Sequence, residues 1–247
     1  MNTMSKNITP YKDSELGKKE QVAQMFDAIA GNYDGLNRVI SFGIDVKWRK
    51  KVVQLVAAKN PETILDIATG TGDLAILMTK TTASEEIIGL DISAGMLEIG
   101  KQKIKEKKLD HKIEMVLGDS EKIPYPDNYF DAITVAFGIR NFENLEKGLT
   151  EILRVLKPNG IFVILETSVP TKFPYKQGYA FHTRFILPII GRLFSKDKVA
   201  YKYLSDSANI FPFGEALNNI LRKIGFIEVK HLPQTFGVAT IYHASKK

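Results

Sequence analysis

The 247-residue sequence contains no cysteine, and its four histidines are scattered along the chain. Without cysteine the protein cannot form disulfides, thiolate metal sites or a thiol nucleophile, and this composition fits a reducing cytoplasm. The histidines show no metal-binding spacing, so no metal ion is expected. No run reaches the roughly 18 apolar residues of a membrane-spanning helix, and residues 1–20 lack the apolar segment of a signal peptide.

Acidic residues are too few to balance the basic ones. The chain carries 34 Lys and Arg against 28 Asp and Glu, a net charge of +6, and its isoelectric point is near 9.2. A basic surface suits RNA or an anionic membrane. The cluster of lysines at residues 101–112 is explained equally well by a solvated helix face. We predict no nucleic-acid partner, while an RNA substrate stays open as an alternative.

Two amphipathic helices are predicted in the first quarter of the chain. The spacing i, i+3, i+4, i+7 is typical of one helical face and marks the first of them, and a similar spacing marks the second. The apolar residues in these patterns are Val22, Met25, Phe26 and Ile29, then Trp48, Val52, Leu55 and Val56. We interpret residues 18–60 as an N-terminal helical lid and residues 1–17 as a flexible tail.

From residue 61 onward, short apolar strands alternate with helical patterns. Strands are predicted at residues 63–67, 86–90, 112–117, 130–136 and 161–166. Such alternation is typical of a parallel sheet with right-handed crossovers. The helices between these strands are expected to begin near residues 74, 93 and 145, with Ser93 as an N-cap.

The alternation lapses after the fifth strand. A helical insertion is expected at about residues 171–212, with a helical pattern from 175 to 194 that Pro188 and Gly191 interrupt. A helix at 213–223 and two strands at 226–231 and 237–243 follow, and these strands are close enough to pair antiparallel. We predict an α/β fold, a doubly wound Rossmann-like domain over residues 61–247, whose seven-stranded sheet has one antiparallel edge strand.

A glycine-rich loop, residues 65–73, lies between the first predicted strand and the next helix. Gly70 and Gly72 allow its backbone to approach a ligand closely. Asp91 ends the second strand, where a carboxylate can accept hydrogen bonds from both ribose hydroxyls of an adenosine. Asp119 follows the third strand, where it can accept from an adenine amino group. These positions predict a cofactor that contains adenosine.

Gly70, Gly72 and Ala75 also fit the loose dinucleotide pattern G-x-G-x-x-G/A, so a nicotinamide cofactor has to be weighed. The loop is flanked by Asp66 and Asp73. Their negative charges are unfavourable beside a pyrophosphate and favourable beside the ammonium and sulfonium groups of S-adenosylmethionine. The sequence therefore favours S-adenosylmethionine, with Asp66 counted among its contacts.

Several separated motifs resemble the ubiquinone/menaquinone biosynthesis C-methyltransferase family, from about Val22 to the C-terminus. The most specific are residues 25–34 with Asn37, 41–45 with 48–49, 137–141, 200–204 and 235–238. The resemblance implies that S-adenosylmethionine methylates a ring carbon of a polyprenylated hydroquinone. The expected reaction converts demethylmenaquinol to menaquinol, and a methoxy polyprenyl benzoquinol, the ubiquinone precursor, is the alternative acceptor.

The resemblance also implies cofactor contacts at Thr71, Asp91 and the pair Asp119-Ser120. Two departures from the family pattern matter. Some members have an asparagine-alanine pair at Asp119-Ser120, so the adenine contact differs in detail. Some have serine where Ala136 stands, so that side chain offers no hydrogen bond here.

Methylation at carbon requires the neighbouring phenol to ionise or nearly so, and a free phenol has a pKa of about 10. Arg140 and Asn141 follow the fourth strand, at the sheet edge where ligands bind. We hypothesise that Arg140 stabilises the phenolate and Asn141 hydrogen-bonds a ring oxygen; a structural salt bridge is the alternative for Arg140. Tyr33 is a third candidate, to contact either substrate or to pack as an ordinary aromatic. His182 is the best general base by residue type, but the sequence does not place it in the site.

The stretch from Phe185 to Ile190, with Leu193 and Phe194, is strongly apolar, and Arg184, Arg192, Lys196 and Lys198 lie nearby. Ordinary core is one interpretation. A channel for the prenyl tail, or a surface that rests on anionic lipid, is the other. We expect a cytoplasmic enzyme, with peripheral contact at the inner face of the membrane as the finer expectation and a homodimer left open. A binding protein without catalysis is the remaining alternative.

Overall fold

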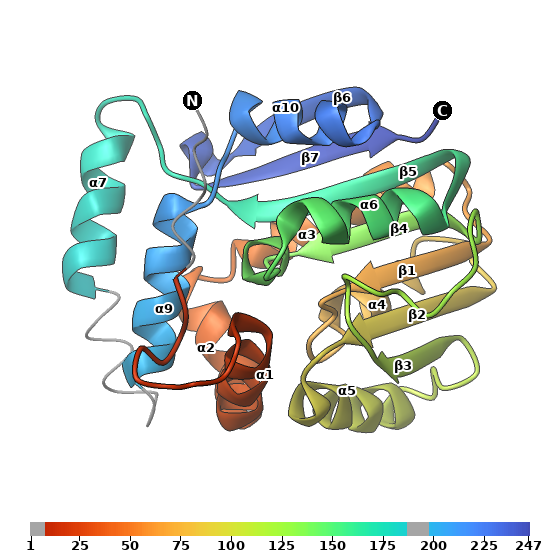
Figure 1. The fold of residues 1–247 in the computed structure, drawn as a ribbon, viewed down its shortest axis with the longest axis horizontal. Coiled ribbons are helices and arrows are strands. Elements are labelled where there is room, and N and C mark those ends of the chain that lie inside the picture. The colour runs from red at the N-terminus through yellow and green to blue at the C-terminus, as the bar shows by residue number, and fades with distance from the viewer. Residues whose placement is uncertain (1–7, 187–197) are drawn as a thin grey trace.

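A seven-stranded sheet in the order β3-β2-β1-β4-β5-β7-β6 forms the centre of the molecule (Figure 1). The structure is a computed structural model that describes residues 8–186 and 198–247. The strands β1 to β5 pair in parallel, so the predicted doubly wound α/β class is confirmed. The strands are β1 (Thr63–Ile67), β2 (Glu86–Asp91), β3 (Ile113–Leu117), β4 (Phe130–Ala136), β5 (Leu156–Thr167), β6 (Ile227–Gln234) and β7 (Ala239–Ser245).

Helices cover both faces of the sheet and bury its apolar side chains in two separate cores. Ser93 caps α5 as predicted, because its Oγ accepts a hydrogen bond from the backbone N–H of Met96 at 3.1 Å. The helices on one face are α3 (Asp45–Ala57), α4 (Asp73–Met78) and α5 (Ala94–Glu106), and those on the other are α6 (Leu145–Val155) and α10 (Glu215–Ile224).

The antiparallel strand is β7, and it lies one place in from the edge rather than at it. It pairs with β5 on one side and with β6 on the other. Six of the seven residues of β7 are buried, whereas β6 has buried residues only at Val229 and Gln234. The apolar strand therefore takes the inner position, and the more polar strand takes the edge, where one side meets water. This corrects the expected antiparallel edge strand.

A group of helices lies beyond the carboxyl ends of the parallel strands. In Figure 1 the arrowheads of β1, β2, β4 and β5 point toward the side where α1, α2, α7 and α9 gather. A third apolar cluster joins α1 to α5 and α9 through Val22, Met25, Met96 and Tyr203. These elements are α1 (Lys18–Ile29), η1 (Ala30–Asn32), α2 (Tyr33–Ile40), α7 (Tyr175–Phe181), η3 (His182–Ile186) and α9 (Lys198–Ile210).

Helix α3 packs on the sheet, although we expected it to belong to the lid. Its side chains Trp48, Val52 and Val56 belong to the same core as the strands. The predicted helix at 175–194 begins at Tyr175 and continues as a π-helical turn from His182, and its remainder lies outside the described residues. Helix α9 is a separate helix that the sequence reading did not resolve. Across the described parts of the chain, no helix is both long and apolar enough to cross a membrane.

Candidate active site

The glycine-rich loop leaves the carboxyl end of β1 in a conformation that few residues adopt. Gly70 and Gly72 have positive φ of 59° and 78°, and Ala68 has a φ of 51°. A non-glycine residue in this region is strained, and such strain persists mainly at functional sites. Phe137, directly after the neighbouring strand β4, has a φ of 60°. The loops after β1 and β4 thus share an unusual backbone shape at the same edge of the sheet.

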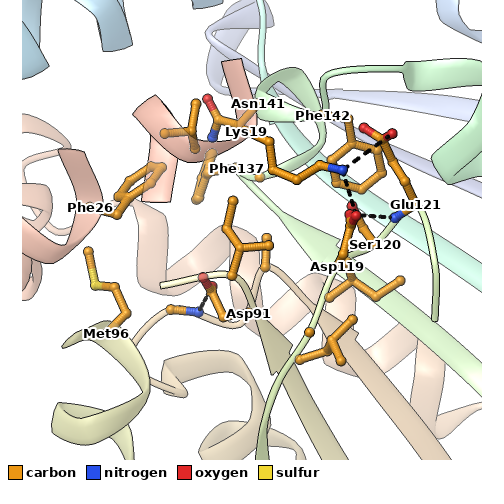
Figure 2. A pocket seen from close by; sticks show the side chains of 18 of the residues that line it. Lys19, Phe26, Asp91, Met96, Asp119, Ser120, Glu121, Phe137, Asn141 and Phe142 are labelled. Atoms are coloured by element: carbon orange, nitrogen blue, oxygen red, sulfur yellow. Dashed lines mark hydrogen bonds and ion pairs between the residues drawn. The ribbon is translucent and has the colours of Figure 1, made fainter. Parts of the chain in front are cut away.

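These loops line a pocket of about 60 Å³, here called the nucleoside pocket. Asp91, Asp119, Ser120 and Asn141 contribute its polar wall. Figure 2 shows Phe26 and Met96 on one side of it and Lys19 reaching to Asp119 on another. Further apolar walls come from Val22, Leu90, Phe137 and Phe142.

Asp91 lies at the end of β2 and faces this pocket, as predicted for a ribose-binding carboxylate. Its Oδ2 accepts a hydrogen bond from Gly70 N–H at 2.8 Å, and its Oδ1 accepts one from Ser93 N–H at 2.9 Å. Burial raises the pKa of Asp91 above its ordinary value, although the backbone N–H groups oppose the shift. Because each carboxylate oxygen has two lone pairs, both oxygens can still accept from a ligand.

Asp119 also faces the pocket but is engaged by α1. Its Oδ2 lies 2.6 Å from Lys19 Nζ, and its Oδ1 accepts from Glu121 N–H at 2.8 Å. The hydrogen bond to Asp119 raises the pKa of Lys19 above its ordinary value. Lys19 therefore fastens α1 over the loop after β3. Sequence reasoning missed this residue, since nothing distinguishes it from the other lysines of a basic chain.

Asp66 does not face the nucleoside pocket, which corrects the expectation that its charge meets the ligand. It is 1% exposed within β1. Its oxygens accept hydrogen bonds from Thr69 Oγ1 at 2.7 Å and Thr134 Oγ1 at 2.6 Å. Burial raises the pKa of Asp66 to about 6, against the opposing effect of these hydroxyls. The side chain holds the start of the loop to strand β4.

Asp73 is likewise turned away from the pocket and pairs with cations from two helices. It lies 2.6 Å from Lys103 Nζ on α5 and 2.9 Å from Arg38 Nη2 on α2. Burial opposes its ionisation, but these cations outweigh burial, and the pKa of Asp73 is lowered. Neither Asp66 nor Asp73 lines the nucleoside pocket.

Thr71 and Gly72 also lie outside the lining of the nucleoside pocket. Thr71 Oγ1 donates to Asp34 Oδ1 at 2.7 Å, and Lys103 Nζ lies 2.8 Å from Asp34 Oδ2. Gly72 precedes the first residue of α4 in a left-handed conformation. These contacts tie α2 to the glycine-rich loop.

A second and larger cavity, of about 650 Å³, adjoins the first, and we call it the acceptor cavity. Its walls come from α2, α3, α7, α9, η2 (Ile139–Asn141) and η4 (Thr235–Gly237). Tyr33 and Phe137 line both cavities. Most of the acceptor cavity's surroundings are apolar or aromatic, among them Ile40, Phe42, Trp48, Tyr179 and Leu204.

Arg140 lines the acceptor cavity and also forms the salt bridge that was its alternative interpretation. Its Nη1 lies 2.5 Å from Glu166 Oε1 and donates to the Phe137 carbonyl at 2.8 Å. The side chains of Arg140 and Glu166 are 8% and 1% exposed. The Arg140 Nε is buried and has no hydrogen-bond partner among the described residues. The salt bridge fixes the guanidinium at the cavity wall without using all of its donors.

Asn141 and Tyr33, the other two candidates for chemistry, occupy different places. Asn141 lines the nucleoside pocket rather than the acceptor cavity, and its Oδ1 accepts from Tyr203 Oη at 3.2 Å. Tyr33 stands at the boundary of the two cavities and packs edge-on against Phe26, with ring centroids 5.8 Å apart. Burial raises the pKa of Tyr33, so its hydroxyl keeps its proton at neutral pH.

His182 lines the acceptor cavity, a position that the sequence could not assign. Phe26, Met96 and Phe137 were also missed as pocket residues. Phe26 and Phe137 belong to the motifs at 25–34 and 137–141 that carried the family resemblance, so a signal for them existed. Within the described residues, no cluster of three metal-ligating side chains is present.

Comparison with known proteins agrees with this architecture. Residues 14–246 match the ubiE/COQ5 methyltransferase family. A demethylmenaquinone methyltransferase of Bacteroides fragilis is 47% identical over the full length of both chains. One from Porphyromonas gingivalis is 43% identical over 97% of this chain and 98% of its own. A ubiquinone/menaquinone biosynthesis C-methyltransferase of Geobacter sulfurreducens is 43% identical over 98% and 93%.

Solved structures share the fold at lower identity. A SAM-dependent methyltransferase from Thermotoga maritima is 20% identical and superposes with a TM-score of 0.66 over 91% of this chain and 99% of its own. The [4+2]-cyclase SpnF is 19% identical with a TM-score of 0.66, over 92% and 96%. The fold alone therefore serves more than one chemistry. The match over residues 14–246, with relatives above 40% identity, shows that this chain belongs to the ubiE/COQ5 methyltransferase family.

Proposed function

We propose that this enzyme transfers a methyl group from S-adenosylmethionine to a ring carbon of a demethylmenaquinol, giving a menaquinol. The observation that carries the proposal is the junction of the two cavities at Tyr33 and Phe137. A donor in the nucleoside pocket and an acceptor in the adjoining cavity would meet at this wall, and such positioning is the main requirement of a displacement reaction. The names and identities of the relatives support the acceptor.

The donor set of the nucleoside pocket fits S-adenosylmethionine. Asp91 offers free acceptor lone pairs to a ribose diol, and Phe26 and Met96 offer apolar surfaces to a planar base. When bound, S-adenosylmethionine supplies an electrophilic methyl group on a sulfonium. We assign Gly70, Asp91, Asp119 and Ser120 to direct contact, and Asp66, Thr71 and Gly72 to shaping the loop.

A pocket of about 60 Å³ is too small for an adenosine, since ligand pockets span roughly 300–1,000 Å³. We therefore propose that α1, η1 and α2 form a lid that opens to admit the donor. Lys18 Nζ donates to the carbonyls of Arg140 and Phe142 at 3.2 and 2.8 Å, and Lys19 pairs with Asp119. These contacts hold the lid closed and exclude water from the reacting groups.

On the acceptor side, we propose that Arg140 stabilises the phenolate of the quinol. Glu166 fixes one edge of the guanidinium. A cation held in a fixed position favours the charge that develops on the phenol oxygen. Asn141 lines the nucleoside pocket and holds Tyr203 through a hydrogen bond. Tyr33 lies between the two cavities and separates the two substrates except at the point of methyl transfer.

We further propose that the enzyme takes its substrate at a membrane surface. Exposed aromatic side chains surround the acceptor cavity, with Phe42 at 72% and Phe236 at 66% exposed. Phe173, Phe181 and Phe185 are exposed nearby on the segment that carries α7 and η3. A prenyl tail that leaves the cavity among these side chains would be shielded from water if they rested on lipid. The apolar residues 187–194 of the sequence lie outside the described residues.

The test of the proposed reaction offers labelled S-adenosylmethionine with one acceptor at a time. Demethylmenaquinol is expected to become methylated, and RNA is not. Asp91→Asn is expected to weaken S-adenosylmethionine binding by at least about tenfold, since a charged hydrogen bond to a ribose hydroxyl contributes about 1.5–3 kcal/mol. Asp110→Asn, at an exposed position, is the matched control. Absence of label in the naphthoquinol product would refute the proposal.

A methoxy polyprenyl benzoquinol is the second candidate acceptor. The relative from Geobacter sulfurreducens is named for both ubiquinone and menaquinone biosynthesis. The cavity volume of about 650 Å³ leaves room for either ring. Competition between the two quinols in one reaction, read as the ratio of the two methylated products, gives the ratio of their kcat/KM values directly.

A further inference from the structure

One imidazole lines the acceptor cavity, that of His182. His182 follows the last residue of α7, and its backbone N–H donates to the carbonyls of Gly178 and Tyr179, so the helix fixes its position. It also begins η3, a π-helical turn. Such turns are rare and recur at functional sites, where they re-aim a side chain.

The imidazole of His182 has an incomplete set of partners. Its Nε2 is buried and has no hydrogen-bond partner among the described residues. The ring packs against Phe42, with centroids 5.9 Å apart and planes inclined by 57°. Buried polar atoms are nearly always hydrogen-bonded, so His182 Nε2 is an unpaired atom in a ring that borders the cavity.

The other ionisable groups at this cavity are less suited than His182 to take a proton from a phenol. Asp45 accepts hydrogen bonds from Arg38 and Arg49 on Oδ2 and from Ser41 on Oδ1, so its carboxylate is already paired with two cations. An arginine side chain has no acceptor atom, and a tyrosine hydroxyl is a poor base. Burial raises the pKa of Tyr33 and Tyr179 further. Besides His182, the ionisable residues that line the cavity are Tyr33 on α2, Asp45 and Arg49 on α3, Arg140 on η2, and Tyr175 and Tyr179 on α7.

We propose that His182 is the general base of the methyl transfer and takes the phenolic proton of the quinol on Nε2. The inference rests on the proposed function. The O–H bond breaks, the proton goes to Nε2, and the electron pair stays on the oxygen. The ring carbon then bonds to the donor's methyl group as the S–CH₃ bond breaks. His182 returns its proton to the oxygen while the ring carbon loses its hydrogen to water, so one proton is released per methyl transferred.

Burial lowers the pKa of His182 below its ordinary value of 6.5. The imidazole is therefore neutral, and able to accept a proton, throughout the neutral range. Arg140 and His182 have different roles at the phenol. The cation of Arg140 stabilises the charge on the oxygen, and the neutral base His182 removes the proton. This division explains how an arginine that cannot act as a base can still sit at the reacting oxygen.

The experiment measures kcat and KM for demethylmenaquinol across pH, from well below to well above the ordinary histidine value. Wild type is expected to lose kcat on the acid side, where the imidazole becomes protonated. His182→Gln is expected to lower kcat by about 100-fold or more and to abolish that acid limb, with the dissociation constant for S-adenosylmethionine unchanged. His182→Ala with added imidazole is expected to regain part of the lost kcat. His111→Gln, at an exposed position, is the matched control and is expected to behave as wild type.

Other outcomes would overturn the assignment. A His182→Gln enzyme with wild-type kcat shows that no proton passes through this residue. A lowered kcat with an unchanged pH profile and no rescue by imidazole shows a packing role instead. If wild type binds S-adenosylmethionine but leaves demethylmenaquinol unmethylated, the proposed function fails and the base assignment fails with it. Either result for His182→Gln described above overturns only the base assignment and leaves the proposed function standing.

Discussion

Single residues in this site are held by contacts with other parts of the chain, and each keeps an atom that can still form a hydrogen bond. Asp91 receives two backbone N–H groups and still has lone pairs to offer. Arg140 is fixed by Glu166 while its Nε stays unpaired, and Glu166 Oε2 is also buried without a partner among the described residues. Groups arranged in this way lose little freedom when a substrate arrives, which is the physical content of preorganisation.

Replacing Arg140 with lysine tests this arrangement. Lysine keeps the charge but loses the planar set of donors that can contact Glu166 and a phenolate together. We expect kcat to fall by about 100-fold, the effect of losing one preorganised donor at a developing anion, with little change in S-adenosylmethionine binding. Arg222→Lys, on the exposed side of α10, should leave kcat unchanged. Full turnover by Arg140→Lys would remove the guanidinium from the chemistry.

Asp66 provides a prediction about stability. Its folded pKa of about 6 is above the ordinary 3.8, so its contribution to stability is complete below the lower value and is lost as pH rises through the higher one. Two units correspond to about 3 kcal/mol at most. The Asp66→Asn side chain cannot ionise, so the variant avoids this loss. The difference in free energy of unfolding, variant minus wild type, should therefore increase by up to about 3 kcal/mol from acidic to alkaline pH. Denaturant unfolding at several pH values measures this difference, and a constant difference would contradict it.

The sequence identified which carboxylates matter but could not tell which of them face the ligand. Asp91 and Asp119 end successive strands, and their position in the pocket follows from topology. Asp66 and Asp73 lie outside the pocket lining, and their partners lie far along the chain: Thr134 is 68 residues from Asp66, and Lys103 is 30 residues from Asp73. Spacing within a loop carries no information about such partners. The same limit applies to His182, whose place depends on how α7 packs.

At the scale of elements, α1 is the part of the proposed lid that we expect to move. Its polar contacts with the rest of the enzyme include Lys18 with two carbonyls and with Glu143, Lys19 with Asp119, and Asp27 with Ser93 and Gly95. The apolar contacts of Val22 and Met25 go to α5 and α9. A helix held by contacts of these kinds can open without disturbing the sheet.

Lys19 is the contact most directly in competition with the donor, because it occupies the Asp119 oxygen that we assign to the adenine. Lys19→Met keeps the aliphatic chain and frees that oxygen. A partly exposed pair contributes at most about 1 kcal/mol, so the dissociation constant for S-adenosylmethionine should fall by up to about fivefold, since 1.4 kcal/mol is tenfold. Calorimetric titration measures it. Lys101→Met, on the exposed face of α5, serves as control, and weaker binding by Lys19→Met would show that the lysine assists the donor instead.

At the scale of the whole molecule, the sheet could be predicted and the acceptor cavity could not. Strands β1 and β4 were predicted with their observed bounds, because short apolar runs between turn residues define them locally. The order of β6 and β7 depends on which strand is more apolar across both faces, and this was not weighed. The acceptor cavity is formed by α2, α3, α7, η3, α9, η2 and η4, which are spread from residue 33 to residue 237. No pattern local to any one of them indicates a cavity.

The aromatic side chains around that cavity give the last prediction. Burying an exposed phenylalanine in an apolar phase contributes about 1.5–3 kcal/mol, so removing two should lower partitioning onto lipid by at least about tenfold. We expect wild type to float with anionic vesicles, and a Phe42→Ser, Phe181→Ser double variant to remain at the bottom of the gradient. Leu117→Ser and Ile227→Ser remove exposed apolar side chains elsewhere, at the ends of β3 and β6, and should float as wild type does. If the wild type stays at the bottom of the gradient with vesicles of every lipid composition tested, the quinol reaches the cavity from solution.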